Sequence, residues 1–237
     1  MTNFMSGKRK RLLVIVCLLL SQQVFAATHL LSGGKVSDGH GKQISTRLND
    51  IDVIKEYPEG IFLAGHEVDA EVNGSKVPTV VMLNARLETL GHWVFNLPIK
   101  EIFRFRGEIY LFDFEGHVYR FENYQWSVDK RWRFDPWSVI YPLQDDLVVC
   151  HPAPLTKAES GTRTGGCRSL GHEWTVPLYW TKPKPQICGQ QIRVVVWVNG
   201  RQLLQTLRLS DGGIHQTTAL SRKAAATKNL DLCQLDH

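Results

Sequence analysis

Short apolar runs separated by polar turns recur along most of the chain. From Leu48 onward the runs are rich in Val, Ile, Phe, Tyr and Trp, and Gly, Pro, Asn and Asp interrupt them. Helical periodicity is weak, and the pattern suggests only one short helix, around residues 221–230. Short strands at regular spacing are typical of β-sandwiches, barrels and propellers. The pattern therefore predicts an all-β domain.

Three stretches of the chain align as copies of one unit. Each copy has a strand, a polar turn and a more apolar strand, and the copies start at Asp52, Glu101 and Ser138. Another strand and then a tryptophan follow in every copy, at Trp93, Trp126 and Trp174. We expect these tryptophans to open equivalent fourth strands, so that each copy forms a four-stranded sheet.

A fourth, fainter copy has two apolar runs, at residues 192–198 and 201–209. The Asn199-Gly200 pair between them is a strong hairpin signal. The tryptophans of the first three copies are 33 and 48 residues apart, which brackets the roughly forty residues of a four-stranded propeller blade. On these features, residues 48–209 resemble a small or incomplete β-propeller with blades of the quinoprotein or Kelch kind. A twisted β-sandwich built from the same hairpins is the alternative.

The first twenty-six residues have the three parts of a secretory signal peptide. Four basic residues, 8–11, precede the apolar run Leu12–Leu20, and Val24 and Ala26 stand at the exit. A membrane span needs about 20 apolar residues, and this run is too short. We expect cleavage between Ala26 and Ala27, with Cys17 removed in the leader. The compact leader is typical of bacteria and predicts a periplasmic location.

Removal of the leader changes the charge. The whole chain carries a formal charge of +5, and four basic and no acidic residues lie in the leader, which leaves +1. A broad positive field for nucleic acid or an anionic membrane is therefore not expected. The expected organisation is a signal peptide (1–26), an extended lead-in (27–47), the β-rich repeat domain (48–209) and a C-terminal segment (210–237).

Four cysteines remain after cleavage, and an even number in an exported chain predicts two disulfides. The repeat places Cys150 and Cys167 on adjacent antiparallel strands, which favours their pairing. Cys188 and Cys233 would then pair and tether the C-terminal segment. The alternative is a metal site at Cys150-His151 with Cys167 and His172, but it lacks the paired spacing of zinc ligands.

No residue pattern indicates a catalytic centre or a cofactor site. Ser32 and Ser169 lie outside a GxSxG elbow, and no glycine loop follows a strand and opens a helix. The acidic pair Asp145-Asp146 occupies a predicted turn, where Asp is common for backbone reasons. The acids at positions 67, 69 and 71 lack calcium-loop spacing. We therefore expect no catalytic residue, metal or cofactor.

The stretch from Tyr124 to Trp137 is dense in aromatic and basic residues. Tryptophan and arginine dominate the hot spots of protein interfaces. The residues predicted to bind a partner are Lys130, Arg131, Trp132 and Arg133. In the alternative interpretation Trp126 and Trp137 belong to the core and Trp132 is a loop tip. An aromatic platform for a sugar ring is a further use of the same residues.

Two functional classes remain after these exclusions. The first is an exported, non-enzymatic module that binds another envelope or secreted protein, in envelope assembly or in neutralising a toxin. The second is a secreted hydrolase of cell-wall or surface carbohydrate, with Asp145, Asp146 or Glu173 as acid and base. The missing catalytic pattern and the aromatic-basic stretch favour the first.

Overall fold

The structure is a computed structural model that describes residues 29–31, 34–37, 41–69, 74–152, 165–180, 183–221 and 230–235. The predicted signal peptide lies outside these residues. So does the predicted short helix, apart from its two end positions. In the part of the chain described, no helix is long and apolar enough to cross a membrane.

Four antiparallel sheets of four strands form most of the fold, each with its strands in chain order. We call them blades 1 to 4. Blade 1 contains β4 (Asp50–Tyr57), β5 (Gly60–Asp69), β6 (Ser75–Leu83) and β7 (Thr89–Val94). Blade 2 contains β8 (Ile99–Phe105), β9 (Glu108–Asp113), β10 (His117–Glu122) and β11 (Gln125–Arg133). Blade 3 contains β12 (Val139–Pro142), β13 (Leu147–His151), β14 (Gly166–Ser169) and β15 (Thr175–Pro177). Blade 4 contains β16 (Gln186–Cys188), β17 (Gln191–Val198), β18 (Arg201–Arg208) and β19 (Ile214–Ala219).

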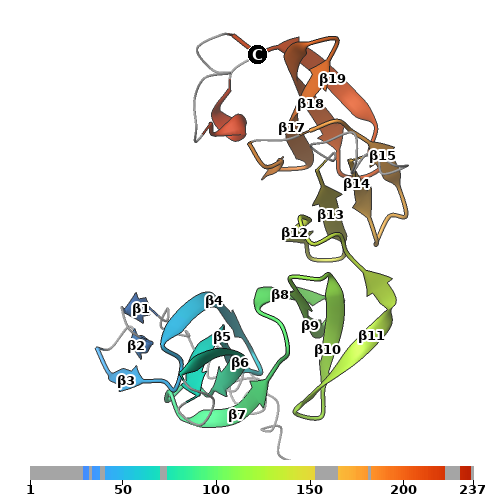
Figure 1. Cartoon of the computed structure of the whole chain (residues 1–237). Coiled ribbons are helices and arrows are strands. Elements are labelled where there is room, and N and C mark those ends of the chain that lie inside the picture. Colours follow the sequence, from blue (N-terminus) through green and yellow to red (C-terminus); the bar gives the residue numbers. More distant parts are fainter. Residues whose placement is uncertain are drawn as a thin grey trace, which may run out of the picture.

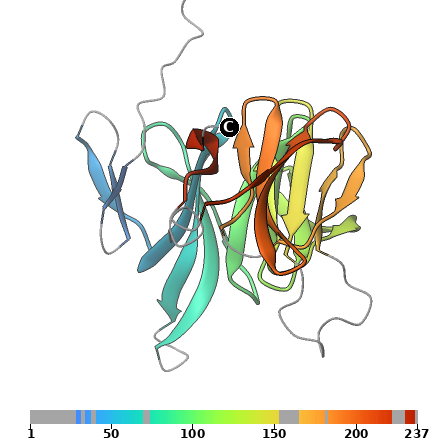
Figure 2. The same cartoon turned by 90° about the horizontal axis from the view of Figure 1, so that it is seen from above.

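The blades stand one after another along an open arc (Figure 1). The first strands of blades 1, 2 and 3 contact each other in turn. Seen from above, the sheets lie side by side (Figure 2). Trp93 and Trp126 lie on the fourth strands of blades 1 and 2, and Trp174 directly precedes that of blade 3. The predicted repeat of four-stranded units is therefore present.

The blades bury both of their faces, which explains why their central strands are continuous apolar runs. In β13, Leu147 and Val149 pack against blade 2, whereas Val148 and Cys150 pack against blade 4. Successive side chains of a strand point to opposite faces, so a sheet between two neighbours needs apolar residues at every position. A blade that packs between two others therefore needs consecutive apolar residues in its central strands.

Tight turns connect several strands within a blade. Asn199 and Gly200 both have positive φ, at 50° and 75°, and join β17 to β18. Positive φ at both central residues defines the type I′ turn, whose twist matches that of the flanking strands. The hairpin predicted here is confirmed. Strand β19 completes blade 4 after residue 209, so the blade continues beyond the predicted end of the repeat domain.

A small sheet covers the outer face of blade 1. It consists of three strands: β1 (His29–Leu31), β2 (Lys35–Ser37) and β3 (Gln43–Ser45). Val36 of this sheet and Leu48 form a buried cluster with Ile61 and Leu63 of β5. The segment predicted as an extended lead-in therefore contains strands that cover the first blade.

The outer face of blade 4 is covered by the C-terminal segment. A short 3-10 helix, η1 (Leu232–Gln234), places Leu232 against Val195 and Leu204. Arg193 of β17 donates from Nη1 to the carbonyls of Leu232 and Leu235, at 2.8 and 2.9 Å. The disulfide Cys188–Cys233 joins the segment to β16. Both end faces of the arc are thus covered by residues of the same chain.

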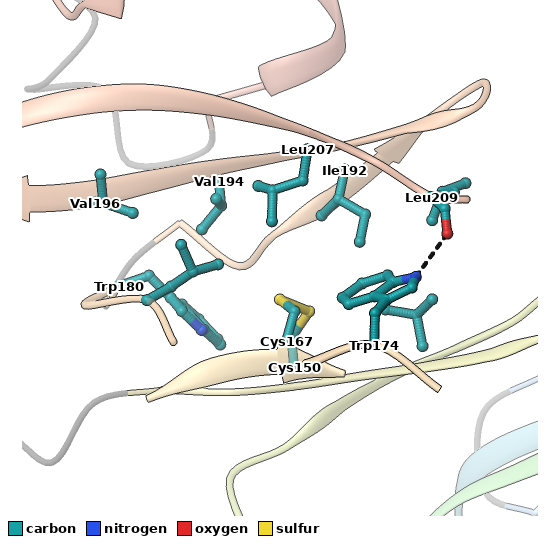
Figure 3. Close-up of a cluster of buried hydrophobic side chains, with 11 residues drawn as sticks. Cys150, Cys167, Trp174, Trp180, Ile192, Val194, Val196, Leu207 and Leu209 are labelled. Atoms are coloured by element: carbon teal, nitrogen blue, oxygen red, sulfur yellow. Dashed lines mark hydrogen bonds between the residues drawn. A yellow bond between two sulfur atoms is a disulfide. The ribbon is translucent and has the colours of Figure 1, made fainter. Parts of the chain in front are cut away.

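The second disulfide, Cys150–Cys167, lies between blades 3 and 4 (Figure 3). The two cysteines are directly opposite each other on β13 and β14. Trp174 packs in the same cluster and donates its indole N–H to the carbonyl of Leu209, at 2.8 Å. Because Cys150 and Cys167 are bonded, the alternative metal site at these cysteines is wrong.

Candidate functional site

The predicted binding residues lie on β11, and the strand is irregular where they occur. Val128 pairs with Tyr119 and Arg133 pairs with His117, so five steps along β11 match two along β10. Such a bulge redirects side chains and is common beside functional sites. The aromatic-basic stretch is therefore a distorted edge strand rather than a loop.

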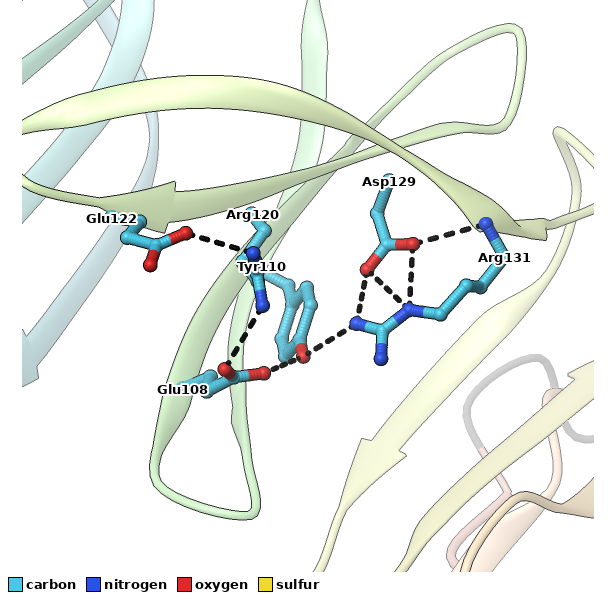
Figure 4. A network of polar contacts seen from close by, with 6 residues as sticks. All are labelled: Glu108, Tyr110, Arg120, Glu122, Asp129 and Arg131. Carbon is cyan, nitrogen blue, oxygen red and sulfur yellow. Dashed lines mark hydrogen bonds and ion pairs between the residues drawn. The ribbon is translucent and has the colours of Figure 1, made fainter.

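Arg131 is exposed, and a polar network on this bulge holds its guanidinium against blade 2 (Figure 4). Its guanidinium donates to both carboxylate oxygens of Asp129, at 2.9 Å to Oδ1 and 2.5 Å to Oδ2. These hydrogen bonds lower the pKa of the Asp129 carboxyl group. Burial and the Glu108 carboxylate raise the pKa of the adjacent Tyr110 to about 12. The charge of Arg131 is therefore already engaged within blade 2.

Trp132 is half-buried and belongs to the packing between blades 2 and 3. Its ring centroid lies 5.0 Å from that of Tyr110 and 5.7 Å from that of Phe105. The guanidinium of Arg131 lies 5.4 Å from the Trp132 ring centroid, in a cation-π contact. The alternative that made Trp132 a loop tip is wrong, because the bulge turns this side chain toward the core.

Trp137, by contrast, is 74% exposed. It follows β11 in a turn where its backbone N–H donates to Asp135 Oδ1, at 2.8 Å. Lys100 of β8 donates to the carbonyl of Pro136 and so holds the turn against blade 2. Phe134 takes the buried position instead, with 3% exposure. The expectation that Trp137 belongs to the core is therefore wrong.

An open cleft lies beside this turn, where blade 2 meets blade 3. Its volume is about 820 Å³. Among the residues that line it are Arg133, Phe134, Pro136 and Ser138 from the end of β11 and its turn, and His151 and Arg168 from blade 3. Trp137 stands in the sequence between two of these lining residues. The cleft combines two arginine side chains with an aromatic ring, and the exposed Trp137 is adjacent in sequence to its wall.

Arg168 is more buried in the wall of the cleft than Arg133. It is half-buried, and its guanidinium lies 5.7 Å from the Phe134 ring centroid. Burial lowers the pKa of this guanidinium below its ordinary value. Within the described ranges it forms no ion pair with a carboxylate. A positive charge in this position favours an anionic group in the cleft.

Ser138 supplies a second polar group in the same wall. Its side chain is 2% exposed, and its hydroxyl oxygen has no hydrogen-bond partner among the residues described. Buried polar groups in proteins are nearly always hydrogen-bonded, so an unpartnered one calls for an explanation. A ligand or an ordered water in the cleft would supply this partner.

The four predicted binding residues thus do not form one surface. Arg133 lines the cleft and Lys130 is exposed on β11, whereas Arg131 and Trp132 are engaged in packing and in the network of Figure 4. Sequence reasoning missed Arg168 as a member of the site. The sequence did contain one signal for it: Arg168 is a basic residue between Cys167 and Ser169, which are both buried in β14.

The residues considered for hydrolysis have structural partners. Ser169 Oγ donates to both carboxylate oxygens of the buried Asp146, at 2.7 and 2.8 Å. The backbone N–H groups of Leu147 and Gly171 also donate to Asp146 Oδ1. Asp146 therefore ties the start of β13 to the end of β14. Asp145 and Glu173 are exposed, and Ser32 lies outside the described residues.

Of the acids at positions 67, 69 and 71, for which no calcium site was predicted, the structure describes only the side chain of Glu67. Glu67 Oε1 lies 2.8 Å from His92 Nε2, within blade 1. The side chains at positions 69 and 71 lie outside the described residues. In the described ranges, no three His, Cys, Asp or Glu side chains are grouped so as to hold a metal ion.

Comparison with known proteins identifies the fold but not a family. No protein-family model matches the sequence, and no curated protein matches it. The structure is similar to BamB from Moraxella catarrhalis, with a TM-score of 0.52 and 9% sequence identity. The match covers 84% of this chain and 62% of that one, so the chain spans less than two thirds of the BamB length. Together with the four-stranded blades, this similarity shows an all-β, propeller-like fold rather than a two-sheet sandwich.

Proposed function

We propose that the chain is an exported, non-enzymatic module that binds another protein in the bacterial periplasm. The observation that carries the proposal is the exposed Trp137 beside a cleft with Arg133 and Arg168 on its walls. Tryptophan and arginine are the residue types most enriched in interface hot spots. A tryptophan whose side chain is mostly exposed is a suitable anchor for a partner.

Two further features support the proposed location. The described residues contain two disulfides, bonds that form and persist in oxidising compartments such as the periplasm. The basic, apolar and small-residue segments at positions 1–26 have the order of a secretory leader. The partner is then another envelope or secreted protein, and the biological role is envelope assembly or the neutralisation of a toxin.

The test is affinity capture with the mature protein as bait, from the envelope of its own host. The bait is compared with Trp137→Ala and with a matched control, Trp197→Ala, which removes another exposed tryptophan on blade 4. We expect one stoichiometric partner with the wild type and the control, and its loss with Trp137→Ala. Truncating a hot-spot tryptophan costs about 2 kcal/mol or more of binding free energy, or about thirtyfold in affinity.

Melting temperatures of the three baits serve as the folding control. Trp137→Ala should melt as the wild type does, because its side chain is mostly exposed. Retention of the partner by Trp137→Ala would refute the proposed surface. Failure of the wild type to retain any protein under oxidising conditions would refute the binding function.

A further inference from the structure

We propose that the cleft between blades 2 and 3 binds a carboxylate side chain of the partner, an Asp or Glu within an extended segment, through Arg168 and Arg133. Trp137 then packs against apolar residues next to that acid. This inference rests on the proposed function and specifies the chemistry of the partner.

The position of Arg168 is the first step of the argument. It lies within β14, where it pairs with Val149 of β13 and Thr175 of β15, and all three residues line the cleft. The adjacent Cys167 is fixed by its disulfide. Strand pairing on both sides fixes the backbone of Arg168, and the contact with the Phe134 ring restrains its guanidinium, which reduces the conformational entropy lost on binding a ligand.

The second step is the balance of charge in the cleft. Two acids line it, Glu115 and Asp135. Asp135 accepts the N–H of Trp137 and acts electrostatically on Lys100, and Glu115 is exposed at the turn between β9 and β10. Neither forms an ion pair with Arg168 in the part of the chain described. The deep positive charge is therefore available to an anion from outside.

The third step is the chemistry of the anion. A guanidinium presents a planar fork of donors that matches the two oxygens of a carboxylate. Arg133 adds a second cation at the edge of the cleft, and the unpartnered Ser138 hydroxyl adds a donor in its wall. Phe134 lies beneath Arg168 and reduces the water around it, which strengthens the attraction. The volume of about 820 Å³ is in the range of ligand sites, and the cleft is open to solvent.

The probe is a library of random twelve-residue peptides displayed on phage, selected on the immobilised mature protein. Peptides recovered from the library are then labelled, and their Kd is measured by fluorescence anisotropy. We expect enrichment of Asp and Glu at one position, next to an aromatic or aliphatic residue. Replacing that acid with its amide should raise the Kd about tenfold or more.

The decisive protein variants are Arg168→Gln and Arg168→Lys. We expect Arg168→Gln to raise the Kd about tenfold or more, and Arg168→Lys to restore part of the affinity, since lysine keeps the charge but not the fork. The amide peptide and Arg168→Gln should show less than additive losses, because they remove the two sides of one contact. Arg201→Gln, an exposed arginine on blade 4, is the matched control and should leave the Kd unchanged.

Several results would overturn the inference. Selected peptides without enriched acids, or a Kd that Arg168→Gln leaves unchanged, would show that the cleft does not bind a carboxylate. A large drop in melting temperature for Arg168→Gln would indicate an internal partner for this arginine. Complete displacement of the peptide by free succinate at micromolar concentration would assign the cleft to a small carboxylate instead of a protein.

The test separates this inference from the proposed function. If Trp137→Ala abolishes capture of the host partner and Arg168→Gln does not, the protein-binding module stands and the carboxylate contact is wrong. If neither variant affects capture of a stoichiometric partner, then both the proposed Trp137 surface and the proposed carboxylate contact are wrong.

Discussion

Removal of the Cys188–Cys233 disulfide tests whether the C-terminal segment is a stable cover for blade 4. In the double variant Cys188→Ser/Cys233→Ser, the unfolded chain regains the freedom of a loop that spans 45 residues. The loop-entropy model gives a loss of about 4 kcal/mol for this length. The Cys150–Cys167 bond spans only 17 residues, and the same model gives about 3 kcal/mol for its removal.

The assay is urea unfolding of the wild type and both double-serine variants, together with amide hydrogen exchange. We expect the Cys188/Cys233 variant to lose about 4 kcal/mol of unfolding free energy relative to the wild type. The Cys150/Cys167 variant loses its loop term and also places two hydroxyl groups in a buried apolar cluster, so its loss should exceed about 3 kcal/mol. Faster exchange should be concentrated in β17 and β18, where Val195 and Leu204 lie under η1. Leu232→Ala, with the disulfide intact, isolates the packing contribution, since Leu232 is fully buried.

Two results would refute this reasoning. A Cys188/Cys233 variant within about 1 kcal/mol of the wild type would show that the loop model overstates the tether. Equal acceleration of exchange in all four blades would show that the disulfide stabilises the whole fold and that the segment is not a local cover.

Three further perturbations have defined outcomes. Trp132→Ala should lower the unfolding free energy by about 2 kcal/mol or more, whereas Trp137→Ala should change it by less than about 0.5 kcal/mol, in the same urea experiment. Because Arg131 lowers the pKa of Asp129, this group stabilises the fold above its unfolded pKa of about 4 and loses that effect as the pH falls through its lower, folded pKa. Asp129→Asn should therefore narrow the stability difference between pH 7 and pH 2, and an unchanged difference would contradict it. Gly116→Ala should cost about 1 kcal/mol or more, because φ is 85° and a Cβ would lie 1.8 Å from the Phe134 carbonyl oxygen; a wild-type melting temperature would contradict it.

The repeat of blades could be predicted because it depends on local patterns. Paired apolar runs such as 61–64 and 147–150 bury alternate residues on two sides, so each run is recognisable without knowledge of its neighbours. The hairpin at Asn199-Gly200 is likewise a local property. The pairing of Cys150 with Cys167 followed from placing them on adjacent strands, and Cys188 and Cys233 were the remaining pair.

The candidate site could not be predicted in the same way. The bulge in β11 shifts the alternation of side chains and Asp129 within it is buried, while a turn on Asp135 after the strand leaves Trp137 exposed. A shift of one residue reverses the face of every following side chain, and the sequence does not show where it occurs. The cleft also requires Arg133 and Arg168 to line one hollow from two different blades. Their placement depends on how the blades pack.

The covered ends of the arc have a consequence for the evolution of this fold. A closed ring must keep a fixed number of blades, because its last blade has to meet its first. In an open row each blade contacts only its neighbours, and the end faces are protected by the small sheet over blade 1 and by η1 over blade 4. Stability in such a row is close to a sum over units and interfaces. Gain or loss of one complete internal blade, about forty residues, would therefore preserve both covers.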